Sequence, residues 1–286
     1  MAGFVAFAVG VALLLTAIAR FAGMAVRQEA SRLRAGVLTV LFVTGVLAAW
    51  WLVTRGASVE ERLLAPLILP SPHEVLLAFP KLHFEQGLVR SILTSFIRVT
   101  VGFSLAAVVA VPLGVYMASF SSVSAFFRPL ALASSYVPIV VFIPLTLAWW
   151  GASEAQKIGF LFIACFVALL PLVIKSISDV APAYLDVALT KGATQWQLVR
   201  EVLFPVALAD IWDHLRGVYG IGWGWIILAE VVAAQQGLGF LIQMSERRGH
   251  TNATFAIIIV IVAIAVICDQ LWRAGGRSLF PYRRKA

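Results

Sequence analysis

Four charged residues interrupt apolar stretches of this sequence and are the side chains best placed to do chemistry. A charge that faces lipid costs several kcal/mol, so each should face protein, water or the end of a helix. The two arginines are suited to attracting an anion along a transport path; alternatively, they reach headgroups or pair with a carboxylate. The glutamate is better suited to a structural or gating contact. The four residues are Arg98, Arg216, Glu230 and Asp269.

Tryptophans form a second group near these stretches. Their rings most often pack or anchor at a membrane interface, and stacking against a substrate is the alternative. Trp223 is grouped with Arg98, Arg216 and Glu230 as candidates for a translocation path. The full tryptophan set is Trp149, Trp150, Trp223 and Trp225.

Patterns typical of enzymes are missing from the sequence. The four histidines are scattered without metal-ligand spacing, and no Ser/His/Asp set or carboxylate pair stands out. Cys165 and Cys268 lie within apolar runs and are expected to pack rather than form a disulfide. The sequence also contains no Gly-x-x-x-x-Gly-Lys-Ser/Thr phosphate loop. We therefore expect no catalytic residue, metal or cofactor in this chain, and any ATP must be bound by a partner.

The composition is that of a membrane protein. Of 286 residues, 61% are hydrophobic and only 13% are charged, and the mean hydropathy is +0.95. A soluble domain of this length needs far more charge to cover its surface. The formal charge is +8, but the basic residues flank apolar runs instead of forming one stripe, which argues against nucleic acid as a partner.

Seven apolar stretches are long enough, or nearly so, to cross a bilayer as helices. The first is followed by Arg20 and preceded by no basic residue, which is the wrong polarity for a signal peptide, so it is interpreted as a span with its N-terminus outside. Loops on one side then carry thirteen Lys and Arg residues and loops on the other carry seven, which places 177–210 and the C-terminus in the cytoplasm. The predicted spans are 3–19, 36–54, 92–117, 129–150, 158–176, 211–234 and 253–272.

These spans suggest four parts. Residues 1–35 hold an additional helix and a basic linker, 36–90 a helix and an extracytoplasmic segment, 91–272 a core, and 273–286 a basic tail. In the second part, Leu69-Pro70-Ser71-Pro72 predicts an extended stretch. Residues 73–79 then predict a short amphipathic helix that would lie along the membrane surface.

The hydrophilic segment 177–210 predicts two short helices with a joint. Pro182 suits a first helical turn, and Gly192 can end that helix in a left-handed conformation. Thr194 and Gln197 have the spacing of a capping box that starts the second helix, and Pro205 is expected to end it. Because each helix has an apolar face, the segment should bury those faces against another protein.

This segment resembles the EAA loop of binding-protein-dependent ATP-binding-cassette (ABC) importers. The family pattern is Glu-Ala-Ala, three residues, Gly, nine residues, Ile, one residue, Leu-Pro. Here the corresponding run is Asp186-Val187-Ala188, Gly192, Val202 and Phe204-Pro205, with the spacing intact but several positions substituted.

The resemblance extends over about 69–272, to permeases for nitrate, bicarbonate, taurine and alkanesulfonates. The motifs that carry it occur in order along the chain: Leu69-Pro70-Ser71-Pro72; Ser95 to Val99 with Gly102-Phe103; Pro112-Leu113-Gly114; Pro144-Leu145; Trp149-Trp150-Gly151 through Glu154 and Lys157; Gly192 to Gln197; Leu215-Arg216; Trp223; Ala229-Glu230; Gly237-Leu238-Gly239; and Asp269.

The resemblance implies an all-α, polytopic type I ABC importer permease fold with one extra N-terminal span plus six, in a bacterial inner membrane. Two copies of the permease would form a homodimer. Two ATPase subunits that bind ATP and Mg would dock on the EAA loop, and an extracytoplasmic binding protein would deliver a small oxyanion. The implied coupling residues are Asp186, Ala188, Gly192, Ala193, Trp196 and Pro205. A secondary transporter driven by an ion gradient is the alternative; it would require paired broken helices or inverted repeats, and no convincing pair is found.

Overall fold

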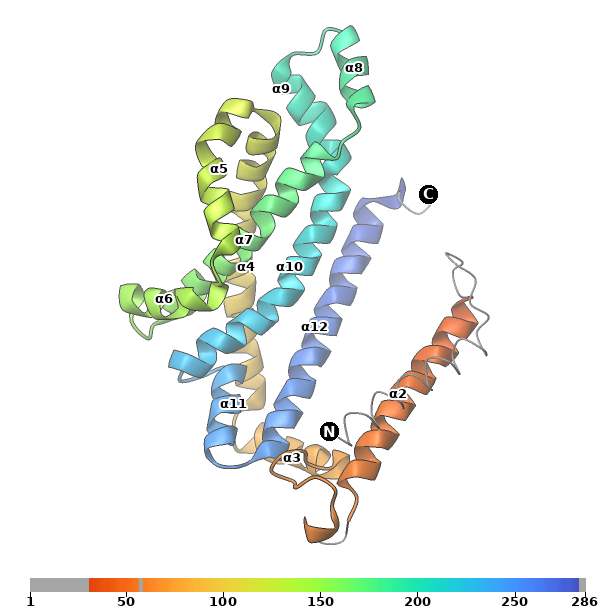
Figure 1. Ribbon diagram of the computed structural model, residues 1–286, viewed down its shortest axis with the longest axis vertical. Helices are drawn as coiled ribbons and strands as arrows, with labels where there is room; N and C mark the ends of the chain where they lie inside the picture. The colour runs from red at the N-terminus through yellow and green to blue at the C-terminus, as the bar shows by residue number, and fades with distance from the viewer. Residues whose placement is uncertain (1–30, 57–58, 283–286) are drawn as a thin grey trace. The chain divides into compact units, whose positions relative to one another are not determined.

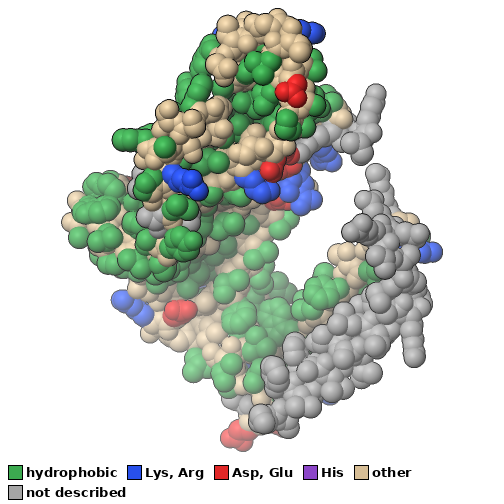
Figure 2. Space-filling view, turned by 45° about the horizontal axis from the view of Figure 1, so that its top comes forward, with side chains coloured by type: hydrophobic (Ala, Val, Ile, Leu, Met, Phe, Trp, Pro, Cys, Tyr) green, Lys and Arg blue, Asp and Glu red, His purple; other side chains and the backbone are tan. Residues whose placement is uncertain are grey.

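The computed structural model describes residues 31–56 and 59–282, and all regular secondary structure in these residues is helical (Figure 1). The chain divides into two compact units, Met1–Ala65 and Pro66–Ala286. On the face shown in Figure 2, hydrophobic side chains cover much of the described surface, and charged side chains form small groups. Such a surface suits a protein that is largely surrounded by lipid.

The first unit contains helix α2 (Arg32–Thr54) and the short 3-10 helix η1 (Val59–Glu61). The Ser31 side chain caps α2 by accepting a hydrogen bond from the Arg34 N–H. Apolar side chains such as Val40 and Phe42 are exposed on α2, and Leu33–Thr54 is long and apolar enough to cross a membrane. The predicted span 36–54 is therefore confirmed as an apolar helix, whereas the predicted span 3–19 lies outside the described residues.

The second unit contains the remaining helices. Four of its helical segments are long and apolar enough to span a membrane: α4, α7, the run from α9 into α10, and α12. They match the predicted spans 92–117, 158–176, 211–234 and 253–272. The helices are α3 (Pro72–Phe84), α4 (Leu88–Ser119), α5 (Ser121–Tyr136), η2 (Ile139–Val141), α6 (Phe142–Trp150), α7 (Glu154–Ser178), α8 (Pro182–Thr190), α9 (Gln195–Gln197), η3 (Leu198–Leu203), α10 (Phe204–Ala233), α11 (Leu238–Arg247) and α12 (Thr251–Leu279).

The prediction of one continuous span over 129–150 is wrong. The structure ends α5 at Tyr136 and resumes helix at Ile139. Val137 and Pro138 are extended, with ψ of 122° and 125°. The proline ring disfavours a helical conformation in the residue before it, so this segment becomes two shorter helical pieces.

Helices α4 and α7 pack closely along their length, which brings their N-terminal halves together. A Cβ on Gly102 would lie 2.6 Å from the Leu161 Cβ, and a Cβ on Gly114 would lie 2.7 Å from a Val173 methyl carbon. Glycine at both positions therefore allows the two backbones to approach, as small residues do between membrane helices.

The predicted short helix after Leu69-Pro70-Ser71-Pro72 is confirmed and extends to Phe84 as α3. Ser71 and Glu74 form a capping box, with the Ser71 N–H donating to Glu74 Oε2 at 2.8 Å. One face of α3 is buried through Val75, Ala78 and Leu82, while Leu76 and Leu77 are exposed. The helix is therefore amphipathic as predicted.

Candidate functional sites

The two-helix unit predicted in 177–210 is present as α8 and α9. Gly192 has φ +81°, and its N–H donates to Leu189 O at 2.9 Å while the Ala193 N–H donates to Ala188 O at 3.1 Å. Thr194 and Gln197 form the predicted capping box, in which the Thr194 N–H donates to Gln197 Oε1 at 2.8 Å. A left-handed glycine and a capped start are thus the local reasons for the turn between α8 and α9.

The expectation that Pro205 ends the second short helix is wrong. Helix α9, the π-helix η3 and α10 form one continuous helical run. In the π turn, the Phe204 N–H donates to Val199 O, five residues earlier. Pro205, which has no N–H to donate, sits in the first turn of α10 and is accommodated without a break. The second helix of the unit is therefore a rigid extension of a membrane span.

The outer face of this unit is apolar and exposed. None of the residues of α8 is buried. Asp186 is exposed, and so are the apolar side chains of Tyr184, Val187 and Leu189. Trp196 is also exposed and stacks on Tyr116 with ring centroids 6.2 Å apart. An exposed apolar patch of this kind marks a surface for a partner.

The inner side of the unit is anchored. Val199 is buried in a cluster with residues from α4, α7 and α10, and Leu203 packs against that cluster. Ala188 and Ala193 are half-buried, and Gly192 is exposed. The unit is therefore held firmly at its base while its outer face remains open. The buried members of the cluster are Val115, Val173, Ile177, Val180, Val199, Ala207 and Ile211.

A second site, the Glu230 cluster, lies at the opposite ends of α7 and α10 and consists of Ser95, Arg98, Glu154, Glu230 and Gly239. The Glu230 side chain is fully buried and that of Arg98 is 3% exposed. Arg98 Nη1 donates to Glu230 Oε1 at 2.8 Å, the Gly239 N–H donates to Glu230 Oε2 at 2.9 Å, and Ser95 Oγ lies 2.8 Å from Oε1. The buried carboxylate is thus satisfied by three donors from two helices, α4 and α11.

Arg98 distributes its other donors between two further elements. Its Nε donates to Glu154 Oε2 at 2.6 Å, its Nη2 donates to Glu154 Oε1, and its Nη1 also donates to Gln236 O at 2.7 Å. The two-pronged pairing with a carboxylate uses the planar geometry of the guanidinium. Glu154 is 63% exposed, so the cluster reaches from a buried carboxylate to the surface.

The loop before α11 is shaped around Glu230. Gly237 has φ +121°, and a Cβ there would lie 2.5 Å from the Glu230 carboxyl atoms. The following Leu238 N–H donates to Ser95 Oγ at 2.9 Å. Gly237 is therefore required both by its backbone conformation and by the close approach of the carboxylate.

The structure brings Arg98 and Glu230 together but not the other path candidates. Arg216 pairs instead with Asp269, with Nε 3.1 Å from Oδ1, and with Asp213. Trp223 is 1% exposed and packs near Phe96, with ring centroids 6.2 Å apart. Each arginine therefore pairs with a carboxylate, as one of the two interpretations of the sequence anticipated.

Sequence reasoning did not assign roles to several residues of the Glu230 cluster. Ser95, Glu154 and Gly239 appear in the motifs that carry the family resemblance, but their shared site was not recognised. The sequence feature that could have identified the site is that each of these three residues is a polar residue or a glycine within a different motif. Only the packing of α4, α7, α10 and α11 shows that these positions meet. Cys165 and Cys268 are both buried with free thiols, as expected.

A family model described as binding-protein-dependent transport system inner membrane component matches residues 110–277. The match spans more than half of the chain, and the chain belongs to this family. It is therefore a permease subunit of an ABC importer and a multi-pass component of the inner membrane. Family membership confirms the resemblance found in the sequence and sets aside the secondary transporter.

Individual relatives agree with this assignment. The chain is 30% identical over 252 residues to a taurine transport system permease protein of Escherichia coli strain K12, which covers 86% of this chain and 88% of the relative. It is 26% identical over 259 residues to a putative aliphatic sulfonates transport permease protein of Bacillus subtilis strain 168, covering 91% and 92%. It is 24% identical over 240 residues to a bicarbonate transport system permease protein of Synechococcus elongatus, covering 82% and 86%.

Solved structures support the fold. An inward facing structure of the MetNI methionine ABC transporter matches with a TM-score of 0.61 at 17% identity, covering 67% of this chain and 95% of that chain. A crystal structure of an amino acid ABC transporter with histidines matches with a TM-score of 0.55 at 17% identity, covering 72% and 97%. The all-α permease fold predicted from the sequence is thereby confirmed.

Proposed function

We propose that this permease imports a small oxyanion and receives its driving force through the exposed apolar face of α8. The observation that carries the proposal is an apolar helix that is open on its outer side and anchored at its base. ABC importer permeases lack a source of energy of their own, and an unburied apolar surface on a rigid support is suited to docking an ATPase subunit. The α8–α9 end would then be the cytoplasmic end.

Movement of a docked ATPase would pass to the membrane spans as a rigid-body shift. Helix α8 follows α7 after a short turn, and α9 continues through η3 into α10. Asp186 would offer charge at the docking surface, Ala188 and Ala193 would allow close approach, and Trp196 would contribute apolar area. Gly192 would act as the joint. Pro205 would not end the unit but would lie within the helix that transmits the movement.

The partners follow from the family. Two copies of this chain would form the translocation path as a homodimer, and two ATP-binding-cassette subunits would bind ATP and Mg. A soluble extracytoplasmic binding protein would deliver the substrate. Taurine, aliphatic sulfonates and bicarbonate share a small anionic oxygen-bearing group, and this is the substrate class that we propose.

The path candidates have different roles in this proposal. Arg98, Glu230 and Trp223 would support the wall of the path from behind, because their polar or aromatic groups are buried against neighbouring helices. Arg216 is half-buried and closer to the α8–α9 end of α10. Arg216 and Glu230 are 14 positions apart on α10, which corresponds to about 20 Å along a helix.

The coupling proposal is tested by Gly192→Leu. A Cβ at Gly192 meets no atom within 4 Å, so the change strains the left-handed joint by about 1–2 kcal/mol without a collision. We expect the variant to be inserted normally but to lose both substrate uptake and co-purification of the ATPase. Gly249→Leu is the matched control, because Gly249 also has a positive φ, +69°, and open space around it. Normal ATPase binding by Gly192→Leu would refute α8–α9 as the coupling unit.

The substrate class needs a separate measurement. The partner binding protein would be titrated with taurine, an aliphatic sulfonate, bicarbonate and nitrate, and uptake of the tightest ligand would be measured in cells with and without the permease. Uptake that requires the permease and is competed by the other oxyanions supports the proposal. Failure of the binding protein to bind any of these four compounds would refute it.

A further inference from the structure

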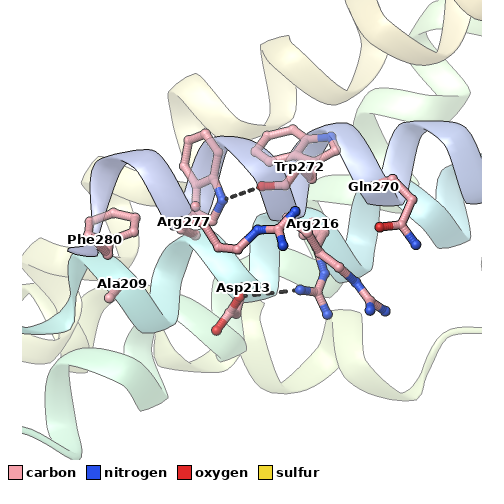
Figure 3. Close-up of a pocket in the computed structure, with 10 residues that line it drawn as sticks. Ala209, Asp213, Arg216, Gln270, Trp272, Arg277 and Phe280 are labelled. Carbon is pink, nitrogen blue, oxygen red and sulfur yellow. Dashed lines mark hydrogen bonds and ion pairs between the residues drawn. The ribbon is translucent and has the colours of Figure 1, made fainter. Parts of the chain in front are cut away.

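A cavity of about 340 Å³ lies between α10 and α12, and no part of the proposed function uses it. Its lining comes from the first half of α10 and the last turns of α12, toward the α8–α9 end (Figures 1 and 3). The lining combines aromatic rings with guanidinium groups. We call it the arginine pocket, and it is defined by Trp212, Arg216, Trp272, Arg273, Arg277 and Phe280.

The floor of the arginine pocket is built from packed aromatic rings. The Trp212 Nε1–H donates to Trp272 O at 3.1 Å, and the two indole rings have centroids 4.7 Å apart. A Cβ on Gly276 would lie 2.9 Å from Trp212 Nε1, and one on Gly275 would lie 3.0 Å from its ring. The pair of glycines thus allows the indole to lie directly against α12, which gives the pocket a fixed apolar floor.

The rim of the arginine pocket carries more positive than negative charge. Asp269 bridges two arginines, with Oδ1 3.1 Å from Arg216 Nε and Oδ2 2.8 Å from Arg273 Nε. Asp213 Oδ1 lies 3.6 Å from Arg216 Nη1. With Arg277, three arginines face two aspartates, so the formal charge of the group is +1.

Arg277 differs from Arg216 and Arg273, which both pair with Asp269. It makes no ion pair with another residue in the described part of the chain, and its side chain gathers with those of Arg216 and Asp213 on the open side of the helix pair (Figure 3). A guanidinium presents its N–H groups as a planar fork that matches the oxygens of phosphate or sulfonate. An exposed fork beside an aromatic floor, with no ion pair to the described residues, is suited to an oxyanion that carries an apolar stem.

We propose that the arginine pocket binds an oxyanion group, either the phosphate of an anionic phospholipid or a free oxyanion. Arg277 and Arg273 donate to its oxygens, and the Trp212 and Trp272 rings contact the apolar part next to it. The pocket lies at the ends of two membrane spans, where headgroups are found, and basic pockets between membrane helices are a known setting for anionic headgroups. This site is separate from the exposed face of α8 and does not depend on the proposed coupling.

The test compares Arg277→Gln with the wild-type chain and with Arg128→Gln, which removes one charge from an exposed arginine on α5. In the lipid arm, each protein is placed in nanodiscs that contain phosphatidylglycerol, and the retained lipid is counted by native mass spectrometry. In the free-anion arm, inorganic phosphate is titrated calorimetrically into protein in phosphatidylcholine nanodiscs. Because a hydrogen bond to a charged group contributes about a factor of ten in affinity, we expect binding to weaken about tenfold in Arg277→Gln only.

The two arms separate the possible sources of the oxyanion. Arginine-dependent retention of phosphatidylglycerol supports the proposal with a lipid as the ligand, and arginine-dependent phosphate binding supports it with a free oxyanion. Arg277→Lys keeps the charge but loses the fork, so it should bind with intermediate affinity. Equal binding by the wild type and by Arg277→Gln combined with Arg273→Gln in both arms would overturn the proposal.

Discussion

The Glu230 cluster and the α8–α9 unit lie at opposite ends of α7 and α10, and they differ in what they bury. The cluster buries charged groups that would normally be exposed. The α8–α9 unit exposes apolar side chains, such as those of Val187 and Leu189, that would normally be buried. The first region satisfies its unusual groups within one chain, whereas the second leaves them for a partner. In the proposed function, the difference separates residues that hold the permease together from residues that would contact the ATPase subunit.

The two regions should respond differently to substitutions. In the Glu230 cluster, Ser95 and Arg98 both hydrogen-bond to one buried carboxylate, so removing either side chain should destabilise the chain. On α8, no side chain is buried, so substitutions should leave stability almost unchanged and affect only association.

Arg98→Met should have the largest effect. It leaves the fully buried Glu230 without its guanidinium partner, and removing one member of a buried ion pair costs about 3–5 kcal/mol. The measurement is the free energy of unfolding in detergent, together with the amount of protein that accumulates in the membrane. Arg90→Met on the same helix is the control, because Arg90 is exposed. Adding Glu230→Gln to Arg98→Met should recover part of the lost free energy of unfolding, because it removes the uncompensated charge. Equal stability of the Arg98→Met and Arg90→Met variants would contradict the prediction.

Gly237→Ala should cost about 1–3 kcal/mol, because it combines a strained positive φ with a collision against the Glu230 carboxyl group. The Cβ would lie 2.5 Å from that group. Gly249→Ala, which has a positive φ but open space, isolates the backbone contribution. Thermal unfolding of both variants in detergent measures the difference. A loss in Gly237→Ala no greater than in the control would mean that the loop does not need its close contact with Glu230.

Ser95→Ala should lower the free energy of unfolding by about 1 kcal/mol. The serine hydroxyl contacts Glu230 and accepts a hydrogen bond from the Leu238 N–H, and a net hydrogen bond contributes about 0.5–1.5 kcal/mol. Thr94→Ala is the control, because the Thr94 hydroxyl donates to Arg90 O within its own helix and is not part of the Glu230 cluster. Chemical unfolding of the two variants should show the larger loss of unfolding free energy for Ser95→Ala. The reverse order would mean that Ser95 does not stabilise the Glu230 cluster.

Leu189→Ser should change the free energy of unfolding by no more than about 0.5 kcal/mol, since its side chain is exposed. It should nevertheless reduce co-purification of the ATPase subunit if α8 is the docking surface. Leu76→Ser on α3 changes another exposed leucine and should leave ATPase association intact. A marked loss of stability in Leu189→Ser would remove the contrast between the two regions.

Features that depend on neighbouring residues were predicted well from the sequence. The turn between α8 and α9 follows from Gly192 and from the Thr194–Gln197 capping box, which act within a few residues. The helix after Leu69-Pro70-Ser71-Pro72 follows from its proline and its cap in the same way. The break at Val137-Pro138 also has a local cause, but the apolar character of 129–150 concealed it.

The sequence by itself determined that this chain is a membrane-spanning helical protein of the importer permease family, because apolar runs, caps and motif spacing are local properties. Only the tertiary structure decided which charges meet. Arg98 is separated from Glu154 by 56 positions and from Glu230 by 132, so no periodicity relates them. The same is true of Pro205, whose place inside a continuous helix depends on the π turn that Val199 anchors in the packed core. The free energy of these arrangements comes from burial and pairing between distant segments, and these exist only after the helices have packed.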